Sequence, residues 1–195
     1  MIESYGRLLL GIKKAIREKA LGVTRFAEKK EGCIRVTSRP LCEEASRWLG
    51  ASAPFDPGDA PLVEDAYVIL PGGSRVARFE NDDGSVDIVD TYAITTMKIA
   101  QLCYLRKQGL GGLLSTHDEH EGLKFDGGYA NWRGALCCEI NWSDGTPFAL
   151  IYISVSGASQ DEDLACAAAA IDVIGDFFAE DEQLTVLAPI VPGNA

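Results

Sequence analysis

The only two histidines in the chain, His117 and His120, lie three residues apart in an acidic, glycine-rich segment. Imidazole nitrogens and carboxylate oxygens are ligands that divalent metal ions accept in proteins. The carboxylates nearest to them in the sequence belong to Asp118, Glu119, Glu121 and Asp126. Histidines at this spacing converge on one ion only if the backbone forms a helical turn there. The segment is therefore interpreted either as a divalent metal site or as a solvated polar loop.

Nucleophilic catalysis has little support in this sequence. No Ser or Cys stands in a nucleophile-elbow pattern, and only two histidines are present to act as a base. The six cysteines are scattered without a Cys-x-x-Cys pair, so we expect reduced and mostly buried thiols. Neighbouring acids such as Asp82 and Asp83 could form the carboxylate pair of a glycosidase, but the sequence does not distinguish such a pair from a solvated acidic surface. The residues alone therefore indicate no particular reaction.

Length and composition indicate a packed domain. The chain has 195 residues, of which 47% are hydrophobic, and this is enough for one core. No apolar run approaches the roughly 18 to 20 residues of a membrane helix, and the N-terminus lacks the order of a signal peptide. We therefore expect a soluble, cytoplasmic protein without a membrane partner.

Charge is divided unevenly along the chain. The net charge is −11, which disfavours nucleic acid as a partner. Residues 1–39 carry 10 Lys and Arg against 4 Asp and Glu, a net +6, whereas residues 40–195 carry 8 against 25, a net −17. Opposite charges favour packing of this basic segment on its own acidic body or on a neighbouring subunit. A basic arm that binds another partner is the alternative.

The N-terminal third contains two expected helices and one strand. Residues 4–20 form an amphipathic helix, because apolar residues recur at helical spacing. Those residues are Leu8, Leu9, Ile12, Ile16 and Ala20. A short strand is expected over Cys33–Thr37, and a second helix from Pro40 to Gly50. Residues 51–61 contain three prolines and mark an extended connection.

The remainder shows an alternation of hairpins and helices. Tyr67–Leu70 and Ser74–Phe79 flank a Pro-Gly-Gly turn and predict a first hairpin. Ser85 is expected to cap a helix that extends to Leu102. Ala135–Trp142 and Phe148–Ser156 predict a second hairpin around Asp-Gly, and the latter strand is apolar on both faces, as a central strand would be.

These elements predict an α+β fold with an antiparallel sheet built from two hairpins and packed by helices, in a profilin-like or PAS-like three-layer arrangement. We expect residues 1–65 to form a basic helical extension with a proline-rich connection. Residues 66–182 then form the main domain, and residues 183–195 form a C-terminal tail.

The junction between Ile151 and Phe178 is the most strongly specified unit. Gly157 ends the strand, and Ser159 and Glu162 have the spacing of a capping box at the start of a helix. A helix N-terminus can bind an anion. Here the first turn already carries three acids, so the pattern favours plain capping over a phosphate site.

A family resemblance emerges at this junction. Ile151–Asp163 resembles the Gly-Val-Ser-Gly-(small)-x-x-Asp-Glu run of the GlcG/HbpS-like family of haem-binding and haem-degrading-type domains. That family is related to a domain attached to some corrinoid adenosyltransferases. Arg78–Gly84, the helix expected over Val86–Ala100 and Phe125–Gly128 follow the family's pattern in the same order. The resemblance covers about residues 66–180.

The resemblance implies a homo-oligomeric small-molecule-binding protein whose ligand is haem or a related tetrapyrrole. His117 or His120 would then be an axial ligand of the iron. Tyr129 and Trp132 would supply an aromatic wall, and Arg133 a partner for a propionate. The alternative for Trp132 is that it anchors the loop against the second hairpin. The alternative functions are a metal-dependent enzyme that uses the two histidines, and a non-catalytic oligomeric assembly module.

Overall fold

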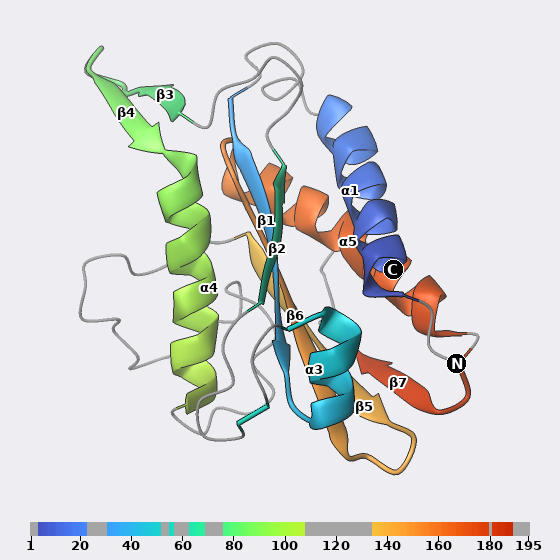
Figure 1. Cartoon of the computed structure of the whole chain (residues 1–195). Coiled ribbons are helices and arrows are strands. Elements are labelled where there is room, and N and C mark those ends of the chain that lie inside the picture. Colours follow the sequence, from blue (N-terminus) through green and yellow to red (C-terminus); the bar gives the residue numbers. More distant parts are fainter. Residues whose placement is uncertain are drawn as a thin grey trace.

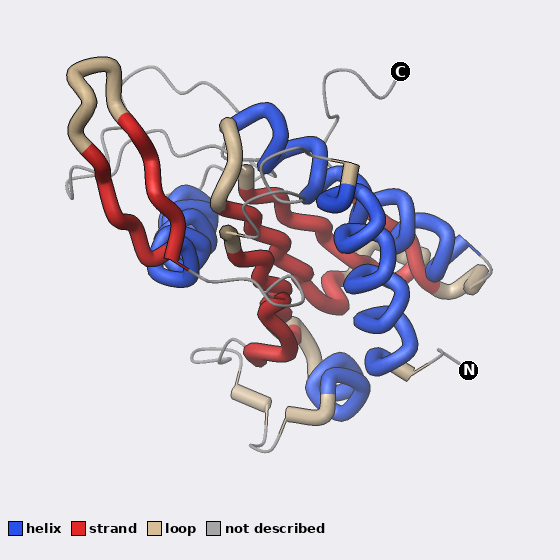
Figure 2. The backbone as a smooth tube through the Cα atoms, turned by 90° about the horizontal axis from the view of Figure 1, so that it is seen from above, coloured by secondary structure: helices blue, strands red, loops and turns tan. Residues whose placement is uncertain are grey.

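The structure, a computed structural model of the 195-residue chain, is an antiparallel sheet covered by helices on both faces (Figure 1). It describes residues 4–22, 31–51, 55–56, 63–68, 76–107, 134–179 and 181–188. Helices α1 (Tyr5–Leu21) and α5 (Gln160–Ala179) cover one face, and α4 (Thr91–Lys107) covers the other (Figure 2). The predicted α+β class, with an antiparallel sheet and an N-terminal helix, is confirmed.

The main sheet has five strands in the order β2-β1-β6-β5-β7, and every pair is antiparallel. The strands are β1 (Cys33–Pro40), β2 (Val63–Val68), β5 (Ala135–Trp142), β6 (Pro147–Ser156) and β7 (Leu184–Leu187). Ile151 at the middle of β6 is opposite Ser38 on one side and Cys138 on the other. The predictions of the β5–β6 hairpin and of β6 as the central strand are confirmed.

One face of the sheet forms the larger core with α1 and α5. Ile34 and Val36 of β1 are buried there together with Ile12 of α1 and Ile174 of α5. A Cβ at Gly11 would lie 3.0 Å from a methyl group of Val173, so the missing side chain lets the two helices approach closely. The first 65 residues, which we treated as an extension, thus contribute α1 and β1 to the same core.

The helix boundaries follow local signals in the sequence. Gly22 follows α1, and Gly50 ends the short helix α3 (Glu43–Leu49) with a left-handed φ of 71°. At the start of α5, the Glu162 carboxylate accepts hydrogen bonds from the backbone N–H and the hydroxyl of Ser159 at 3.0 and 2.8 Å. The Ser159 hydroxyl accepts from the Glu162 backbone N–H at 3.3 Å. The predicted capping box is confirmed.

The pairing predicted between Tyr67–Leu70 and Ser74–Phe79 is wrong. Strand β2 pairs with β1, whereas β3 (Val76–Glu80) pairs with β4 (Val86–Asp90) in a separate two-stranded ribbon. The predicted turn itself lies outside the described residues. β1 offers β2 a free edge with which it forms backbone hydrogen bonds. This long-range pairing outweighs the local turn signal, which favoured a hairpin with β3.

The helix predicted from Ser85 begins later than expected. Residues 86–90 form β4, and α4 begins at Thr91. The Asp90 carboxylate accepts a hydrogen bond from the Tyr92 backbone N–H at 3.0 Å, which satisfies one of the free donors of the first turn. Residues 86, 88 and 89 are β-branched and favour the strand. Strand β7 is a further difference, because the sequence places it in a tail, whereas Leu184 is buried against the core.

A buried ion pair joins α4 to the sheet and to α5. The Lys98 ammonium group donates to a carboxylate oxygen of Asp163 at 3.0 Å and to the carbonyl oxygen of Val155 at 2.6 Å. The other Asp163 oxygen accepts from the Ala158 backbone N–H at 3.1 Å. The two charged side chains are only 3% and 5% exposed. One residue of α4 thereby connects the end of β6 to the start of α5.

Burial opposes both charges of this pair. Desolvation raises the pKa of Asp163 to about 6, although the nearby Lys98 and the hydrogen bonds to the carboxylate counteract the rise. Desolvation likewise lowers the pKa of Lys98, and Asp163 counteracts that fall. The pair is therefore maintained by its close geometry, and removing one partner leaves an uncompensated charge in the interior.

Gly134 makes room for the ion pair. It has a φ of +102°, a conformation that side-chain-bearing residues rarely adopt. A Cβ there would lie 2.7 Å from the Cβ of Asp163 and 3.0 Å from the Lys98 nitrogen. Its carbonyl oxygen accepts a hydrogen bond from the Val155 backbone N–H at 2.9 Å. The start of β5 is thus built around the Lys98–Asp163 contact.

We predict that Lys98→Met and Asp163→Asn each lower the free energy of unfolding by about 3 to 5 kcal/mol, because each leaves a buried charge without its partner. The Lys98→Met/Asp163→Asn double variant removes both charges, and the introduced side-chain amide still offers an oxygen to the Ala158 N–H. It should therefore cost less than the sum of the single variants. Denaturant unfolding of the four proteins measures this coupling, and strictly additive costs would contradict it.

The cost of Lys98→Met should also depend on pH. Without the ammonium group, the pKa of Asp163 in the folded state rises beyond the wild-type value of about 6. An acid with a raised folded-state pKa loses stability as pH rises from its unfolded value to its folded value. In wild type the loss of stability is complete near pH 6, the folded-state pKa of Asp163. In the variant it continues to higher pH, because the folded-state pKa is higher. The stability gap should be wider at about pH 8 than at about pH 5; an equal gap would contradict the assignment.

Candidate functional site

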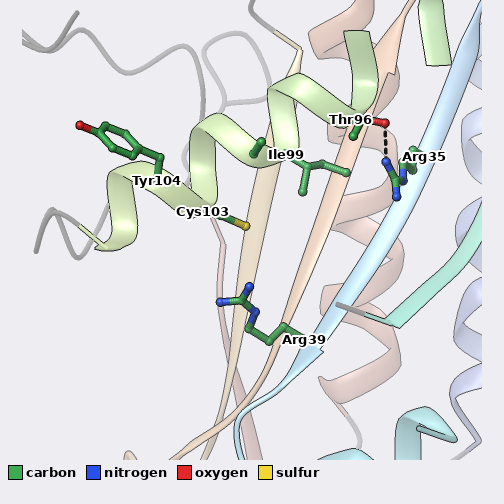
Figure 3. A pocket seen from close by; sticks show the side chains of 7 residues that line it. Arg35, Arg39, Thr96, Ile99, Cys103 and Tyr104 are labelled. Atoms are coloured by element: carbon green, nitrogen blue, oxygen red, sulfur yellow. Dashed lines mark hydrogen bonds between the residues drawn. The ribbon is translucent and has the colours of Figure 1, made fainter. Parts of the chain in front are cut away.

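A pocket of about 320 Å³ lies between α4 and β1 (Figure 3). Its described lining residues are Arg35, Arg39, Thr96, Ile99, Ala100, Cys103 and Tyr104. The two arginines come from β1, and the other five residues come from α4. Arginines four positions apart on a strand project from the same face of the sheet, about 13 Å apart along it. The pocket therefore has a cationic wall and a mainly apolar wall.

Arg35 is held in place by α4. Its guanidinium group donates a hydrogen bond to the Thr96 hydroxyl oxygen at 2.5 Å and lies over the ring of Tyr92, 5.3 Å from the ring centroid. The Thr96 hydroxyl in turn donates to the Tyr92 carbonyl oxygen at 3.0 Å. These contacts fix one end of the pocket and orient the guanidinium plane before any ligand arrives.

Arg39 lies at the other end of the pocket. Its side chain extends from β1 toward Cys103 on α4 (Figure 3). The Nε atom of Arg39 is buried and has no hydrogen-bond partner among the described residues. Arg39 as a whole is only partly buried, but a buried N–H of a charged group that lacks an acceptor costs more than that of a neutral group, since charged donors are strongly hydrated in the unfolded chain. Arg39 is therefore the side chain in this pocket with most to gain from an acceptor.

Three further polar atoms on the same sheet face share this property. They are the hydroxyl oxygens of Thr37, Tyr152 and Ser154, which are buried and without a hydrogen-bond partner in the described part of the chain. Thr37 lies between the two arginines on β1 and is opposite Tyr152 on β6. Buried polar groups are paired in the great majority of cases. These three hydroxyl groups are fully buried and do not line the pocket, so they make the interior beneath it unusually polar.

Tyr152 remains a neutral phenol at this site. Its side chain is fully buried, and burial raises the pKa of its hydroxyl far above the ordinary value of 10. The thiols of Cys137 and Cys103 reinforce the rise, whereas the positive charge of Arg39 opposes it. The Cys103 thiol is close enough to interact with the hydroxyl, but a thiol is a weak partner. Tyr152 is thus available as a hydrogen-bond donor and not as a base.

The arrangement can bind an anion that carries an apolar group. Two guanidinium groups favour a carboxylate, sulfonate or phosphate, and no described lining residue is acidic. Ile99, Ala100 and Cys103 offer an apolar surface on α4. The concentration of positive charge here contrasts with the net charge of −11 of the whole chain. The pocket is therefore a local exception to an acidic surface.

The residues that the sequence proposes as a site are not among those that the structure describes. His117, His120, Tyr129, Trp132 and Arg133 fall outside the described residues, so the structure does not place them. Within the described ranges, no three His, Cys, Asp or Glu side chains gather as a metal site would require. The metal and haem interpretations of that segment stay predictions.

The cysteines follow the expectation from the sequence. All six are free, four of them are buried, and Cys42 and Cys103 are partly buried. Burial raises the pKa of the Cys138 and Cys166 thiols to about 12, so both remain protonated at neutral pH. Cys103 is the one that lines the pocket.

The sequence does contain a signal for the cationic wall, which our interpretation missed. Within β1, Arg35, Thr37 and Arg39 alternate with Ile34 and Val36. A strand with a polar face normally leaves that face in solvent. Here α4 covers part of it, and the alternation cannot reveal this, because the covering helix is more than fifty residues away in the sequence.

Comparison with known proteins adds no relatives. No protein-family model matches the chain, and neither the curated proteins nor the solved structures give a significant match. Across the described segments, no helix combines the length and apolar character that crossing a membrane requires. Function is therefore argued from the geometry of the pocket.

We predict that Tyr152→Phe leaves the free energy of unfolding unchanged or raises it by up to about 1 to 3 kcal/mol, because the buried hydroxyl that it removes has no hydrogen bond stronger than a contact with the Cys103 thiol. Tyr5→Phe is the matched control. The Tyr5 and Ser38 hydroxyls are hydrogen-bonded at 2.5 Å in the opposite core, so this change should cost about 1 kcal/mol. Chemical denaturation compares the two variants. An equal loss in both would show that the Tyr152 hydroxyl has a stabilising partner.

Proposed function

We propose that the protein binds a small organic acid, with a carboxylate, sulfonate or phosphate group joined to an apolar ring or chain, in the pocket between α4 and β1. The buried and unpartnered Nε of Arg39, within the described part of the chain, is the observation that carries this proposal. It stands beside a pocket of about 320 Å³, a volume within the range of sites for small molecules.

The acid group of the ligand is assigned to the β1 side. Charge-assisted hydrogen bonds from a guanidinium group to an oxyanion are about twice as strong as neutral ones. Arg39 would gain an acceptor for its buried Nε–H. Arg35 adds a second positive charge whose position Thr96 already fixes. A ligand anion would thus satisfy a buried donor that has no partner among the described residues.

The apolar part of the ligand is assigned to α4. Ile99 is almost fully buried, and Ala100 and Cys103 lie one turn apart around it. Tyr104 is 40% exposed and lines the outer part of the pocket, where an aromatic ring can cover a ligand. This division of charge and apolar surface between two elements favours amphiphilic ligands over inorganic ions.

Haem or a related tetrapyrrole is a specific member of this ligand class. It combines a large apolar ring with propionate carboxylates, and the family resemblance implies it. In this proposal Arg39 binds a propionate, and the histidine-bearing segment, His117 and His120, supplies the axial ligand. The arginine assignment rests on the pocket, whereas the histidine assignment rests on the sequence.

Anilinonaphthalene sulfonate, a fluorescent dye that joins a sulfonate to aromatic rings, is a direct probe of the pocket. We predict that wild type binds the dye and that Arg39→Gln weakens binding by about tenfold to a hundredfold, the value of a charge-assisted hydrogen bond. Arg39→Lys keeps the charge but lacks the planar fork of the guanidinium group, so its affinity for the dye should lie between those of wild type and Arg39→Gln. Naphthoate should displace the dye, and the uncharged naphthamide should not.

Arg47→Gln is the matched control for this experiment. The Arg47 side chain is 69% exposed on α3 and pairs with Glu43 at 3.7 Å, so the change removes the same charge away from the pocket. Melting midpoints of all variants show whether the fold persists. Equal weakening by Arg39→Gln and Arg47→Gln would reduce the effect to general electrostatics and contradict the proposal.

Haemin titration tests the tetrapyrrole separately. A Soret shift on binding, weakened in Arg39→Gln and changed in position in the His117→Ala/His120→Ala double variant, is the expected result. A shift that the histidine variant leaves unchanged would exclude histidine ligation. The absence of any Soret shift, beside normal dye binding, would exclude tetrapyrroles while the broader class of organic acids stands.

A further inference from the structure

The β3–β4 ribbon projects from the start of α4, away from the main sheet (Figures 1 and 2). Within the described chain its strands pair only with each other, and β3 contacts the body at α4. At the middle of β3, the Arg78 backbone N–H donates a hydrogen bond to the Glu31 carboxylate at 2.9 Å. Isolated two-stranded ribbons are marginally stable in water, so a second surface that covers one face would stabilise this one.

One face of the ribbon exposes two large apolar side chains, with Arg78 opposite Ile88 across the ribbon. Ile88 is 70% exposed and Val86 is 54% exposed, and both project from the same face of β4. Glu80 is opposite Val86 across the ribbon. Residues 76–90 carry five acids and one arginine, a net charge of −4. Large exposed apolar side chains within a charged rim are typical of an interaction surface.

The exposed side of α1 has the complementary composition. Leu10 is 73% exposed, the highest value among the large exposed hydrophobic residues of the described segments. Arg7, Lys14 and Arg17 are exposed and lie three, four and seven residues from it, on the same side of the helix. Residues 5–21 carry five basic residues and one acid, a net charge of +4. Leu10 thus lies in a segment of net positive charge, whereas Val86 and Ile88 lie in a ribbon of net negative charge.

The two surfaces cannot meet within one molecule as it is built. The ribbon begins at α4, and α1 lies on the opposite face of the sheet (Figure 2). Only a second copy can present an α1 to the ribbon of the first. The charges favour that encounter, since opposite net charges of equal size attract and like surfaces repel.

We propose that the β3–β4 ribbon of one copy docks on the exposed face of α1 of a second copy. Ile88 and Val86 then cover Leu10, while the acids of the ribbon face Lys14 and Arg17. The contact joins two different surfaces, so it closes a dimer if each copy uses both surfaces and otherwise extends to longer assemblies. It is independent of the ligand pocket, because none of the pocket-lining residues takes part.

Size-exclusion chromatography with light scattering over a concentration series tests this contact. Wild type should show a mass above that of the monomer that rises with concentration. Ile88→Ser and Leu10→Ser should each weaken association by about tenfold or more. Leu187→Ser, at a large exposed residue of β7, is the matched control and should leave the mass unchanged. A wild type that is monomeric throughout would overturn the proposal.

Charge reversal identifies the two surfaces. The ribbon variant Glu80→Lys/Asp82→Lys and the helix variant Lys14→Glu/Arg17→Glu should each associate weakly alone. An equal mixture should regain association, because the reversed ribbon of one copy then faces the reversed helix of the other. Added salt should weaken wild-type association, as the Debye length falls from about 10 Å at 0.1 M to about 3 Å at 1 M. Failure of the mixture to associate would contradict the pairing of these surfaces.

Discussion

The contact between Lys98 and Asp163 is the constraint on which the placement of α4 depends. It connects the middle of α4 to the end of the central strand β6 and to α5, and Gly134 leaves the space for it. Apolar packing alone gives α4 a small core among the described residues, where Ile99 and Leu102 are its two members of the buried cluster on that face. A buried ion pair adds little net stability but fixes one geometry. The position of α4, and with it the shape of the pocket, follows from that geometry.

The sheet face beneath α4 is built for something other than stability. The opposite face is packed mainly by apolar side chains of α1 and α5 around Ile151, whereas this face buries polar atoms of Thr37, Arg39, Tyr152 and Ser154 without partners in the described part. Proteins accept such costs at functional sites more often than elsewhere. Of these residues, Arg39 lines the pocket, and the proposed ligand acid would satisfy its Nε–H. In the proposed complex, binding and stability would be coupled through Arg39, and the acidic ribbon on α4 belongs to a separate surface.

Local sequence patterns predicted the helices and strands better than they predicted which strands pair with each other. The capping box at Ser159 and the turn between β5 and β6 depend on residues that are neighbours in the sequence, so both were predicted correctly. The ribbon and the ion pair were missed, because they depend on contacts across 65 residues, as between Lys98 and Asp163, or on the competition between a local turn and an open sheet edge. Arg39 was missed for the same reason, since only the covering helix makes it part of a pocket. The histidine-bearing segment stays a prediction.

The central claim is that Arg39 receives an acid group of the ligand, and the NMR signal of its side-chain Nε–H tests it most directly. The signal can be assigned by its loss in Arg39→Lys. Titration with naphthoate should shift this signal in a saturable way, with the same affinity as dye displacement, while the corresponding signal of the exposed Arg47 stays in place. Saturable binding of naphthoate without a change in the Arg39 signal would contradict the account.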